Sequence, residues 1–281
     1  MQVGSFIVEQ LSEGFFEIFK DGTIQKIGPA ALENQHIESD FQRNTIAVGI
    51  DPLFISGYEM NIIVDPGLGW GLDYKSRFKD TSNVKTNLDI FDVRPEDIDF
   101  VILTHLHFDH TAGCTFVSDE IKTTPTFPNA RYLVHKKEWE HAIAHIDQSS
   151  GLYGDGYRLD ELYKLAAEGR FRFIDRENFF PVRGLELIHT GGHSPGHMVL
   201  RIHDHGNTAW YTGDLIPSEN HLNQTELPIA DTDPLQAKKM KTEILKRAYN
   251  EKAVIFFYHS LFKKAGKLSL NKEENFVLYD L

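Results

Sequence analysis

The chain has 281 residues, 41% of them hydrophobic, which is enough to bury the core of one large domain covering residues 1–281. A formal net charge of −12 argues against a nucleic-acid partner, because binding to phosphates requires a basic surface. A single cysteine cannot form an internal disulfide, and no run approaches the roughly 20 apolar residues that span a bilayer. With no basic segment and apolar core at the N-terminus, we expect no signal peptide and a cytoplasmic location.

Short apolar runs bounded by turn residues predict early strands over Ser5–Val8, Phe15–Phe19, Thr45–Val48 and Asn61–Asp65. Later elements are expected in the order helix Asn87–Val93, strand Phe100–Leu103, strand Arg131–His135, helix Lys136–His145, helix Arg158–Glu168 and strand Arg170–Ile174. Asp233 and Pro234 are a typical N-cap and first-turn pair, and they begin a helix whose apolar residues recur at helical spacing. Strands interleaved with helices favour an α/β fold of stacked sheets under outer helices.

Four potential metal ligands follow the apolar run Phe100–Leu103 within six residues: His105, His107, Asp109 and His110. In open α/β sheets, ligands bind at the carboxyl ends of strands, where this stretch lies. Imidazole and carboxylate suit zinc, iron, manganese or nickel. Four such groups are too many for one tetrahedral ion that also holds a water, so we predict two divalent metals.

Three further candidates lie directly beyond strand-like runs, namely His193, Asp214 and His259. One histidine in such a place is more often a structural residue than a ligand. Four strand ends that all carry ligand-type side chains make a purely structural role improbable. The other histidines without motif support, among them His205 and His221, are expected on the surface or in the core.

In these motifs the chain resembles the metallo-β-lactamase superfamily of hydrolases, whose HxHxDH motif is met by His105 to His110. Its later motifs are matched in order by Asp65, His193, Asp214 and His259. The resemblance implies an α/β fold with four layers, an αβ/βα sandwich with the metals at one edge between the sheets. It also implies the ligand sets: His105, His107 and His193 for one metal, Asp109, His110 and His259 for the other, with Asp214 bridging.

A hydroxide shared by two metals would then be the nucleophile, since two cations lower the pKa of a bound water. Asp109 is expected to take up its proton, so Asp109 and Asp214 are the candidate catalytic residues. Zinc is the expected metal, with manganese, iron, cobalt and nickel as alternatives. Asp65 and His197 are expected to hydrogen-bond the ligands from behind, as residues around metal sites usually do.

Within the superfamily, Thr104–His110 and Gly191–His197 look most like the N-acyl-homoserine lactonases, which would imply a role in quorum quenching. The stretch Gly213–Ile216 is similar to that of methyl parathion hydrolase. Opening of lactones is therefore the expected activity. The alternatives are a phosphotriesterase, another ester or thioester hydrolase, and a non-catalytic metal-binding protein.

The best-known lactonases place a tyrosine three residues after the bridging aspartate, where this chain has Pro217. The candidates to replace it are Tyr58, Tyr74, Tyr153, Tyr157 and Tyr211. Phe108, Trp70 and Phe16 are the aromatic residues expected to line a pocket for a small-molecule substrate. Cys114 is expected to be a buried packing residue. A homodimer remains open.

Overall fold

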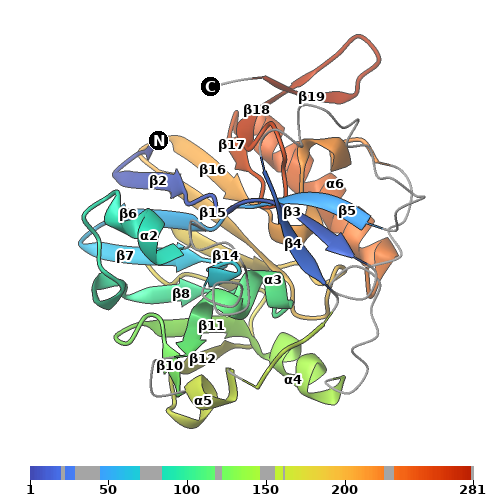
Figure 1. Ribbon diagram of the computed structural model, residues 1–281. Coiled ribbons are helices and arrows are strands. Elements are labelled where there is room, and N and C mark those ends of the chain that lie inside the picture. Colours follow the sequence, from blue (N-terminus) through green and yellow to red (C-terminus); the bar gives the residue numbers. More distant parts are fainter. Residues whose placement is uncertain are drawn as a thin grey trace.

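The computed structural model describes residues 1–19, 23–28, 45–69, 84–117, 122–145, 156–160, 162–224 and 231–279. Two seven-stranded sheets stack on each other in this part of the chain (Figure 1). The first sheet consists, in spatial order, of β1 (Gln2–Val3), β2 (Phe6–Gln10), β6 (Leu53–Gly57), β7 (Met60–Val64), β8 (Phe100–Ile102), β11 (Arg131–His135) and β12 (Phe171–Ile174). The second consists of β13 (Asn178–Phe179), β14 (Leu185–His189), β15 (Met198–Asp204), β16 (Asn207–Tyr211), β17 (Val254–Phe256), β18 (Ala265–Leu270) and β19 (Phe276–Tyr279).

Smaller elements complete the described fold. A three-stranded sheet has the order β4 (Ile24–Ile27), β3 (Gly14–Phe19), β5 (Thr45–Ile50), and β9 (Thr115–Val117) pairs with β10 (Thr123–Pro125). The α-helices are α2 (Val84–Asp89), α3 (Phe108–Thr111), α4 (Lys136–Ala144), α5 (Leu162–Ala167) and α6 (Pro234–Asn250). Short 3-10 helices are η2 (Pro95–Asp97), η3 (Ala112–Cys114), η5 (Gly213–Leu215) and η6 (Glu219–His221).

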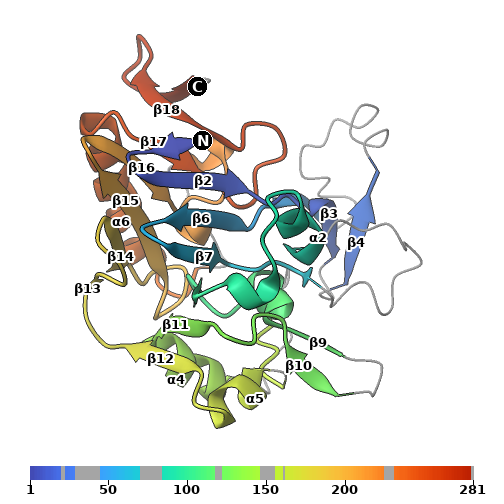
Figure 2. The ribbon, with the colours of Figure 1, turned by 90° about the vertical axis from the view of Figure 1, so that its left-hand side faces the viewer.

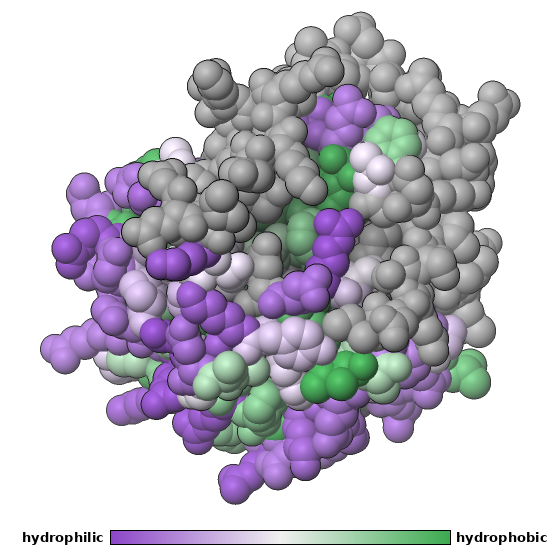
Figure 3. Space-filling model, turned by 60° about the horizontal axis from the view of Figure 1, so that its bottom comes forward, coloured by the Kyte–Doolittle hydropathy of each residue, from purple (hydrophilic) through white to green (hydrophobic). Residues whose placement is uncertain are grey.

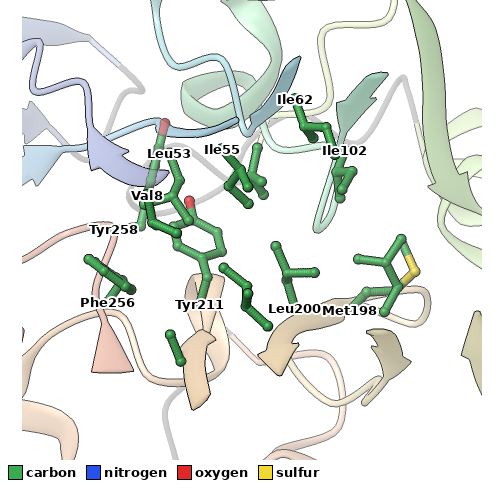
Figure 4. Close-up of a cluster of buried hydrophobic side chains, with 14 of the residues drawn as sticks. Val8, Leu53, Ile55, Ile62, Ile102, Met198, Leu200, Tyr211, Phe256 and Tyr258 are labelled. Atoms are coloured by element: carbon green, nitrogen blue, oxygen red, sulfur yellow. The ribbon is translucent and has the colours of Figure 1, made fainter. Parts of the chain in front are cut away.

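Strand alternation builds the interior from both sheets. In β7, Ile62 and Val64 point into a central cluster between the sheets, whereas Ile63 between them points to the opposite face. From the second sheet, Leu200 and Tyr211 join the same central cluster (Figure 4). Each fully buried side chain of this size contributes about 1.5–3 kcal/mol, so this interface is a main source of stability.

The outer faces of the two sheets are covered by helices. Ile63, on the outer face of the first sheet, belongs to a cluster that includes Leu88 of α2 and Leu165 of α5. In Figure 2, α4 and α5 lie beside β11 and β12. On the second sheet, Ile244 of α6 belongs to a cluster with Trp210 of β16. The layers are therefore helix, sheet, sheet, helix, and the expected αβ/βα sandwich is confirmed.

The predicted strands all occur, and the start of α6 is as expected, because the Asp233 side chain accepts a hydrogen bond from Gln236 N. The bounds of two helices were wrong. The helix expected over Asn87–Val93 ends at Asp89, after which Asp92 adopts a φ of +55° that a right-handed helix excludes. The helix expected over Arg158–Glu168 is α5, Leu162–Ala167. Residues 158–160 of its expected first turn are not helical, and Tyr157 just before them forms an isolated β-bridge with His107.

On the face shown in Figure 3, hydrophilic and apolar side chains of the described residues are intermixed. Within the described residues, no helix combines the length and apolar character required to cross a bilayer. Cys114 is buried, as expected for a packing residue. The extent of the domain over residues 1–281, the cytoplasmic location and a homodimer stay predictions.

Candidate metal centre

All seven expected ligands follow strands of the two sheets. His105, His107, Asp109 and His110 lie in the loop and short helix α3 that follow β8. The other three follow strands of the second sheet: His193 after β14, Asp214 after β16 and His259 after β17. Because β16 and β17 are parallel, as β8 is to both of its neighbours, six of the seven candidates follow parallel strands, and only His193 follows an antiparallel one.

The structure brings these side chains into two groups, His105, His107, His193 and Asp214 in the first group and Asp109, His110 and His259 in the second. Within each group the candidate ligand atoms lie within 4.8 Å of one another. In the first group, His107 Nδ1 is 3.0 Å from His105 Nε2 and 3.2 Å from His193 Nε2. Each group is thus close enough for its members to share one ion.

Asp214 faces both groups, one with each carboxylate oxygen. Its Oδ2 lies 3.5 Å from His193 Nε2 and 3.9 Å from His105 Nε2. Its Oδ1 lies 3.2 Å from His110 Nε2 and 3.3 Å from His259 Nε2. This is the arrangement that a bridging carboxylate requires.

Glycine is needed just before Asp214. Gly213 has a φ of +48°, and a Cβ at this position would lie 2.9 Å from His197 Nε2 and 3.0 Å from Thr104 Oγ1. The chain can therefore turn toward the site after β16 only because residue 213 has no side chain.

Two buried atoms in the centre fit a divalent cation. His110 Nε2 and Asp214 Oδ1 have no hydrogen-bond partner among the described residues. Such atoms are costly to bury without a partner, and imidazole nitrogen and carboxylate oxygen are both good ligands of zinc and similar metals. The donor set of the site thus suits two divalent ions.

The pKa values show the same concentration of charge. Burial alone would lower the pKa of His110, but Asp214, Asp109 and Asp65 outweigh it and raise that pKa well above 6.5. Burial alone would raise the pKa of Asp214, but His259 and His110 hold it well below 3.8. Asp214 is therefore an ionised carboxylate, as a bridging ligand must be.

Hydrogen bonds behind the histidines set their tautomers. Asp65 Oδ2 accepts from the hydroxyls of Thr104 and Tyr211 and lies 3.0 Å from His110 Nδ1, so the proton of His110 is on Nδ1. Thr104 Oγ1 donates to Asp65 Oδ2 at 2.6 Å and so accepts from His105 Nδ1 at 3.0 Å. His259 Nδ1 donates to the Gly49 carbonyl at 2.9 Å. In their neutral forms, all three rings thereby present the lone pair of Nε2 to the centre.

Asp65 and His197 are both hydrogen-bonded to residues of the two ligand groups. Thr190 Oγ1 donates to the His197 carbonyl at 3.1 Å and accepts from His197 Nδ1 at 2.8 Å. His197 Nε2 therefore carries a lone pair, which accepts the backbone N–H of Asp214 at 3.2 Å. His197 thus holds the backbone of Asp214 in place.

Sequence reasoning missed Asp231. Its Oδ1 lies 3.0 Å from His193 Nδ1, so it fixes the tautomer of His193 as Asp65 fixes that of His110. The backbone N–H of Thr232 donates to the His193 carbonyl at 3.0 Å, which keeps this segment beside the ligand loop. A carboxylate two residues before an N-cap carries no motif, so only the folded chain shows this contact.

Tyr258 was also missed. Its hydroxyl donates to the Asp109 carbonyl at 2.6 Å, and its ring stacks on that of His110 with the centroids 3.9 Å apart. From the sequence, the apolar run before His259 was interpreted only as a strand. Its last residue in fact supports two members of the second group.

The expected pocket residues have different surroundings. Phe108 is half-buried, and the guanidinium carbon of Arg158 lies 4.1 Å from the centre of its ring. Phe16 is only 2% exposed and belongs to the central cluster. Trp70 lies outside the described residues. A substrate-binding role of these three residues stays a prediction.

None of the described tyrosine candidates offers a free hydroxyl in place of the lactonase tyrosine. Tyr58 donates to Asp204 at 2.8 Å, Tyr157 to Glu138 at 3.2 Å and Tyr211 to Asp65 at 3.1 Å. Tyr74 and Tyr153 lie outside the described residues. Pro217 itself contributes its carbonyl, which accepts the backbone N–H of His259 at 2.9 Å.

Curated relatives of the chain are lactonases. N-acyl homoserine lactonase AiiA of Bacillus thuringiensis subsp. kurstaki is 29% identical over 171 residues, which cover 59% of this chain and 58% of that protein. N-acyl homoserine lactonase AttM of Azorhizobium caulinodans is 24% identical over 180 residues, 61% of this chain and 63% of that protein. The chain thus spans roughly 60% of the length of these relatives.

Solved structures resemble the chain over nearly its whole length. A probable metal-dependent hydrolase from Staphylococcus aureus has a TM-score of 0.77 at 27% identity and covers 100% of this chain and 98% of its own. AidC, a dizinc quorum-quenching lactonase in complex with a product, has a TM-score of 0.71 at 22% identity, with 100% and 97% covered. The characteristic sequence pattern of the metallo-beta-lactamase superfamily matches residues 52–259, which include every ligand candidate of the centre. With the sandwich fold, this match establishes that the chain belongs to the metallo-β-lactamase superfamily.

Proposed function

We propose that this protein is a hydrolase with two divalent metals and that it opens lactones, N-acyl-homoserine lactones among them. The observation that carries the proposal is the position of Asp214, whose two carboxylate oxygens each face a different group of ligand atoms. A single metal would need only one of these groups. Two complete groups joined by one carboxylate favour a dinuclear hydrolase over a protein that has lost its activity.

Two bound metals would supply an activated water at neutral pH and polarise the carbonyl oxygen of the substrate. The chain's own contribution is to hold the ligands in fixed tautomers and to move a proton. Asp109 Oδ2 lies 3.4 Å from His259 Nε2 and 4.0 Å from His110 Nε2, at the edge of the second group. We assign to this oxygen the transfer of a proton from the attacking water to the leaving alcohol.

The lactone substrate is supported by the activity named for the curated relatives. It also agrees with the charge of the chain, since a protein of net −12 repels polyanionic substrates. We further propose that Phe108, which lies between two ligand candidates in the sequence, contacts the acyl chain. Each methylene that becomes buried there would add about 0.8 kcal/mol, so turnover should improve with acyl length until the pocket is filled.

A phosphotriesterase is the second candidate, and Pro217 favours it. A proline cannot donate the hydrogen bond that the lactonase tyrosine gives to a substrate carbonyl, and the described tyrosines near the site already donate elsewhere. The stretch Gly213–Ile216 also resembles that of methyl parathion hydrolase. The same two ligand groups would serve either substrate.

The test has two parts. Elemental analysis of protein purified without chelator should give two divalent metals per chain, with zinc expected, and reconstitution with manganese, iron, cobalt or nickel shows which ions the site accepts. The metal-loaded protein is then assayed with acyl-homoserine lactones of increasing chain length, a phosphotriester, a β-lactam and a glutathione thioester. Turnover of the phosphotriester or thioester without lactone hydrolysis would refute the lactonase assignment. Two bound metals without turnover of any substrate would favour a metal-binding protein.

A further inference from the structure

Glu138 is a buried carboxylate that the proposed chemistry does not use. It lies in the first turn of α4 and is 0% exposed. No lysine or arginine within the described ranges forms an ion pair with it. A carboxylate in such a place needs hydrogen-bond donors to compensate for the loss of water.

Four donors surround this side chain, two on each oxygen. Glu138 Oε1 accepts from the backbone N–H of Leu106 at 3.0 Å and from the Tyr157 hydroxyl at 3.2 Å. Glu138 Oε2 accepts from the Ser194 hydroxyl at 2.7 Å and from the backbone N–H of Gly196 at 3.0 Å. Both oxygens are therefore fully engaged as acceptors.

Each donor segment adjoins the first ligand group. Leu106 lies between His105 and His107 in the chain, and Ser194 directly follows His193. Tyr157 forms an antiparallel bridge with His107, and the two rings have centroids 5.2 Å apart. None of the four donors neighbours Asp109, His110 or His259 in the chain, so the contact favours one group over the other.

The loop that carries His193 is shaped to reach Glu138. A Cβ on Gly196 would lie 2.2 Å from Glu138 N and 2.3 Å from Glu138 Cβ. Only a glycine permits this approach, so the backbone N–H of residue 196 can meet the carboxylate directly. The contact between the two segments thus depends on both residues, the glycine at 196 and the carboxylate at 138.

We propose that Glu138 is a positioning residue for the group His105, His107 and His193, and that this group needs its carboxylate to hold a metal. The inference rests on the dinuclear site of the proposed function. Orientation is its physical basis: one buried side chain sets the relative positions of two ligand loops from different sheets. Residues that orient metal ligands in this way typically change metal affinity by about 10- to 100-fold.

An amide cannot replace this carboxylate. The hydroxyls of Tyr157 and Ser194 can rotate and accept, but the N–H groups of Leu106 and Gly196 cannot. Because one backbone N–H points at each oxygen, the NH₂ group of a glutamine would oppose a donor in either orientation. Glu138→Gln therefore changes the hydrogen bonding at nearly constant volume.

The test is a two-site metal titration against a chromophoric chelator, with zinc and with cobalt as probes. In Glu138→Gln, we expect one site to weaken by about 10- to 100-fold and the other to stay within about threefold of wild type. Glu140→Gln is the matched control, because Glu140 lies on the same helix with a side chain that is 61% exposed. It should leave both sites unchanged.

The affected site is identified in backgrounds where only one group is complete. With His259→Ala, which leaves the first group intact, Glu138→Gln should remove the remaining metal. With His193→Ala, which leaves the second group intact, it should not. Should Glu138→Gln fail to fold, Ser194→Ala, which removes one of the four hydrogen bonds, must still weaken the same site by about threefold or more.

Unchanged affinities in Glu138→Gln, or equal losses at both sites, would overturn the role of Glu138 and leave the proposed function standing. A wild-type protein that binds fewer than two metals would instead refute the dinuclear function itself. The two failures are therefore distinguishable within one set of titrations.

Discussion

Replacing Asp65 by asparagine exchanges one oxygen of a fully buried side chain for an NH₂ group. His110 Nδ1, which donates a hydrogen bond to that oxygen, would then have to accept one. Asp65 Oδ1 accepts the backbone N–H of Thr104 at 2.8 Å, so the amide oxygen of an asparagine must keep this place. The amide nitrogen then replaces Oδ2, which accepts from Thr104 Oγ1, His110 Nδ1 and Tyr211 OH. The two hydroxyls can rotate, but His110 has to present a lone pair at Nδ1.

The proton of His110 then moves to Nε2, the atom that lies 3.2 Å from Asp214 Oδ1. An imidazole protonated there cannot bind a metal. Keeping the metal-binding tautomer would instead sacrifice a charge-assisted hydrogen bond, at about 1.5–3 kcal/mol. At about 1.4 kcal/mol per tenfold change, Asp65→Asn should weaken the second metal by about 10- to 150-fold.

The assay is the competition titration with a chelator, combined with thermal unfolding of the metal-free protein. Asp204→Asn is the matched control, because Asp204 is also buried and accepts hydrogen bonds from Ser5 N and Tyr58, outside both ligand groups. It should lower stability without changing metal affinity. Wild-type affinity for both metals in Asp65→Asn would refute the tautomer argument.

Three further predictions concern the same centre. Asp214→Ala should lose metal from both groups and nearly all turnover, whereas His205→Ala, whose side chain is 68% exposed, should keep wild-type metal content and rate. Asp231→Ala should weaken the first group by about 10- to 100-fold in the titration while the second group is unaffected. The third prediction concerns pH. Burial opposes protonation of His110, but Asp214, Asp109 and Asp65 keep its pKa well above 6.5. Above pH 6.5 the metal-free fold therefore retains a proton that the unfolded chain loses. As pH rises from 6.5 through that pKa, this proton's stabilisation of the metal-free fold is lost and its competition with metal ends. The rise in Tm on adding zinc should therefore grow with pH, and a constant or shrinking rise in thermal scans would contradict the assignment.

How far the sequence predicts this molecule depends on the range of each interaction. The HxHxDH stretch and the strand ends at His193, Asp214 and His259 are local patterns, so the sandwich and the gathering of the ligands could be foreseen. Glu138 and Asp231 could not, because their partners lie 19–58 and 38 residues away along the chain. Neither lies in a motif, and a glutamate on a helix is most often a solvated residue.

The wrong start of the helix expected from Arg158 also results from contacts that are distant in the sequence. The segment reads as the start of a helix, but Tyr157 is held in an extended bridge with His107 and by its hydrogen bond to Glu138. Tertiary contacts override local helix propensity at such places. Asp65 likewise adopts a φ of +48°, which the neighbouring residues in the sequence do not predict.

The division of the ligands between the two sheets has a kinetic consequence. His105 and His259 lie 154 positions apart (259 − 105), on loops that follow strands of different sheets. Ions bound between these loops would cross-link the two sheets. The sheets could then separate only after an ion has left. In the loaded protein, the rate of irreversible inactivation should follow metal release rather than the intrinsic opening of the core, so a chelator would shorten its lifetime against proteases even at temperatures far below Tm.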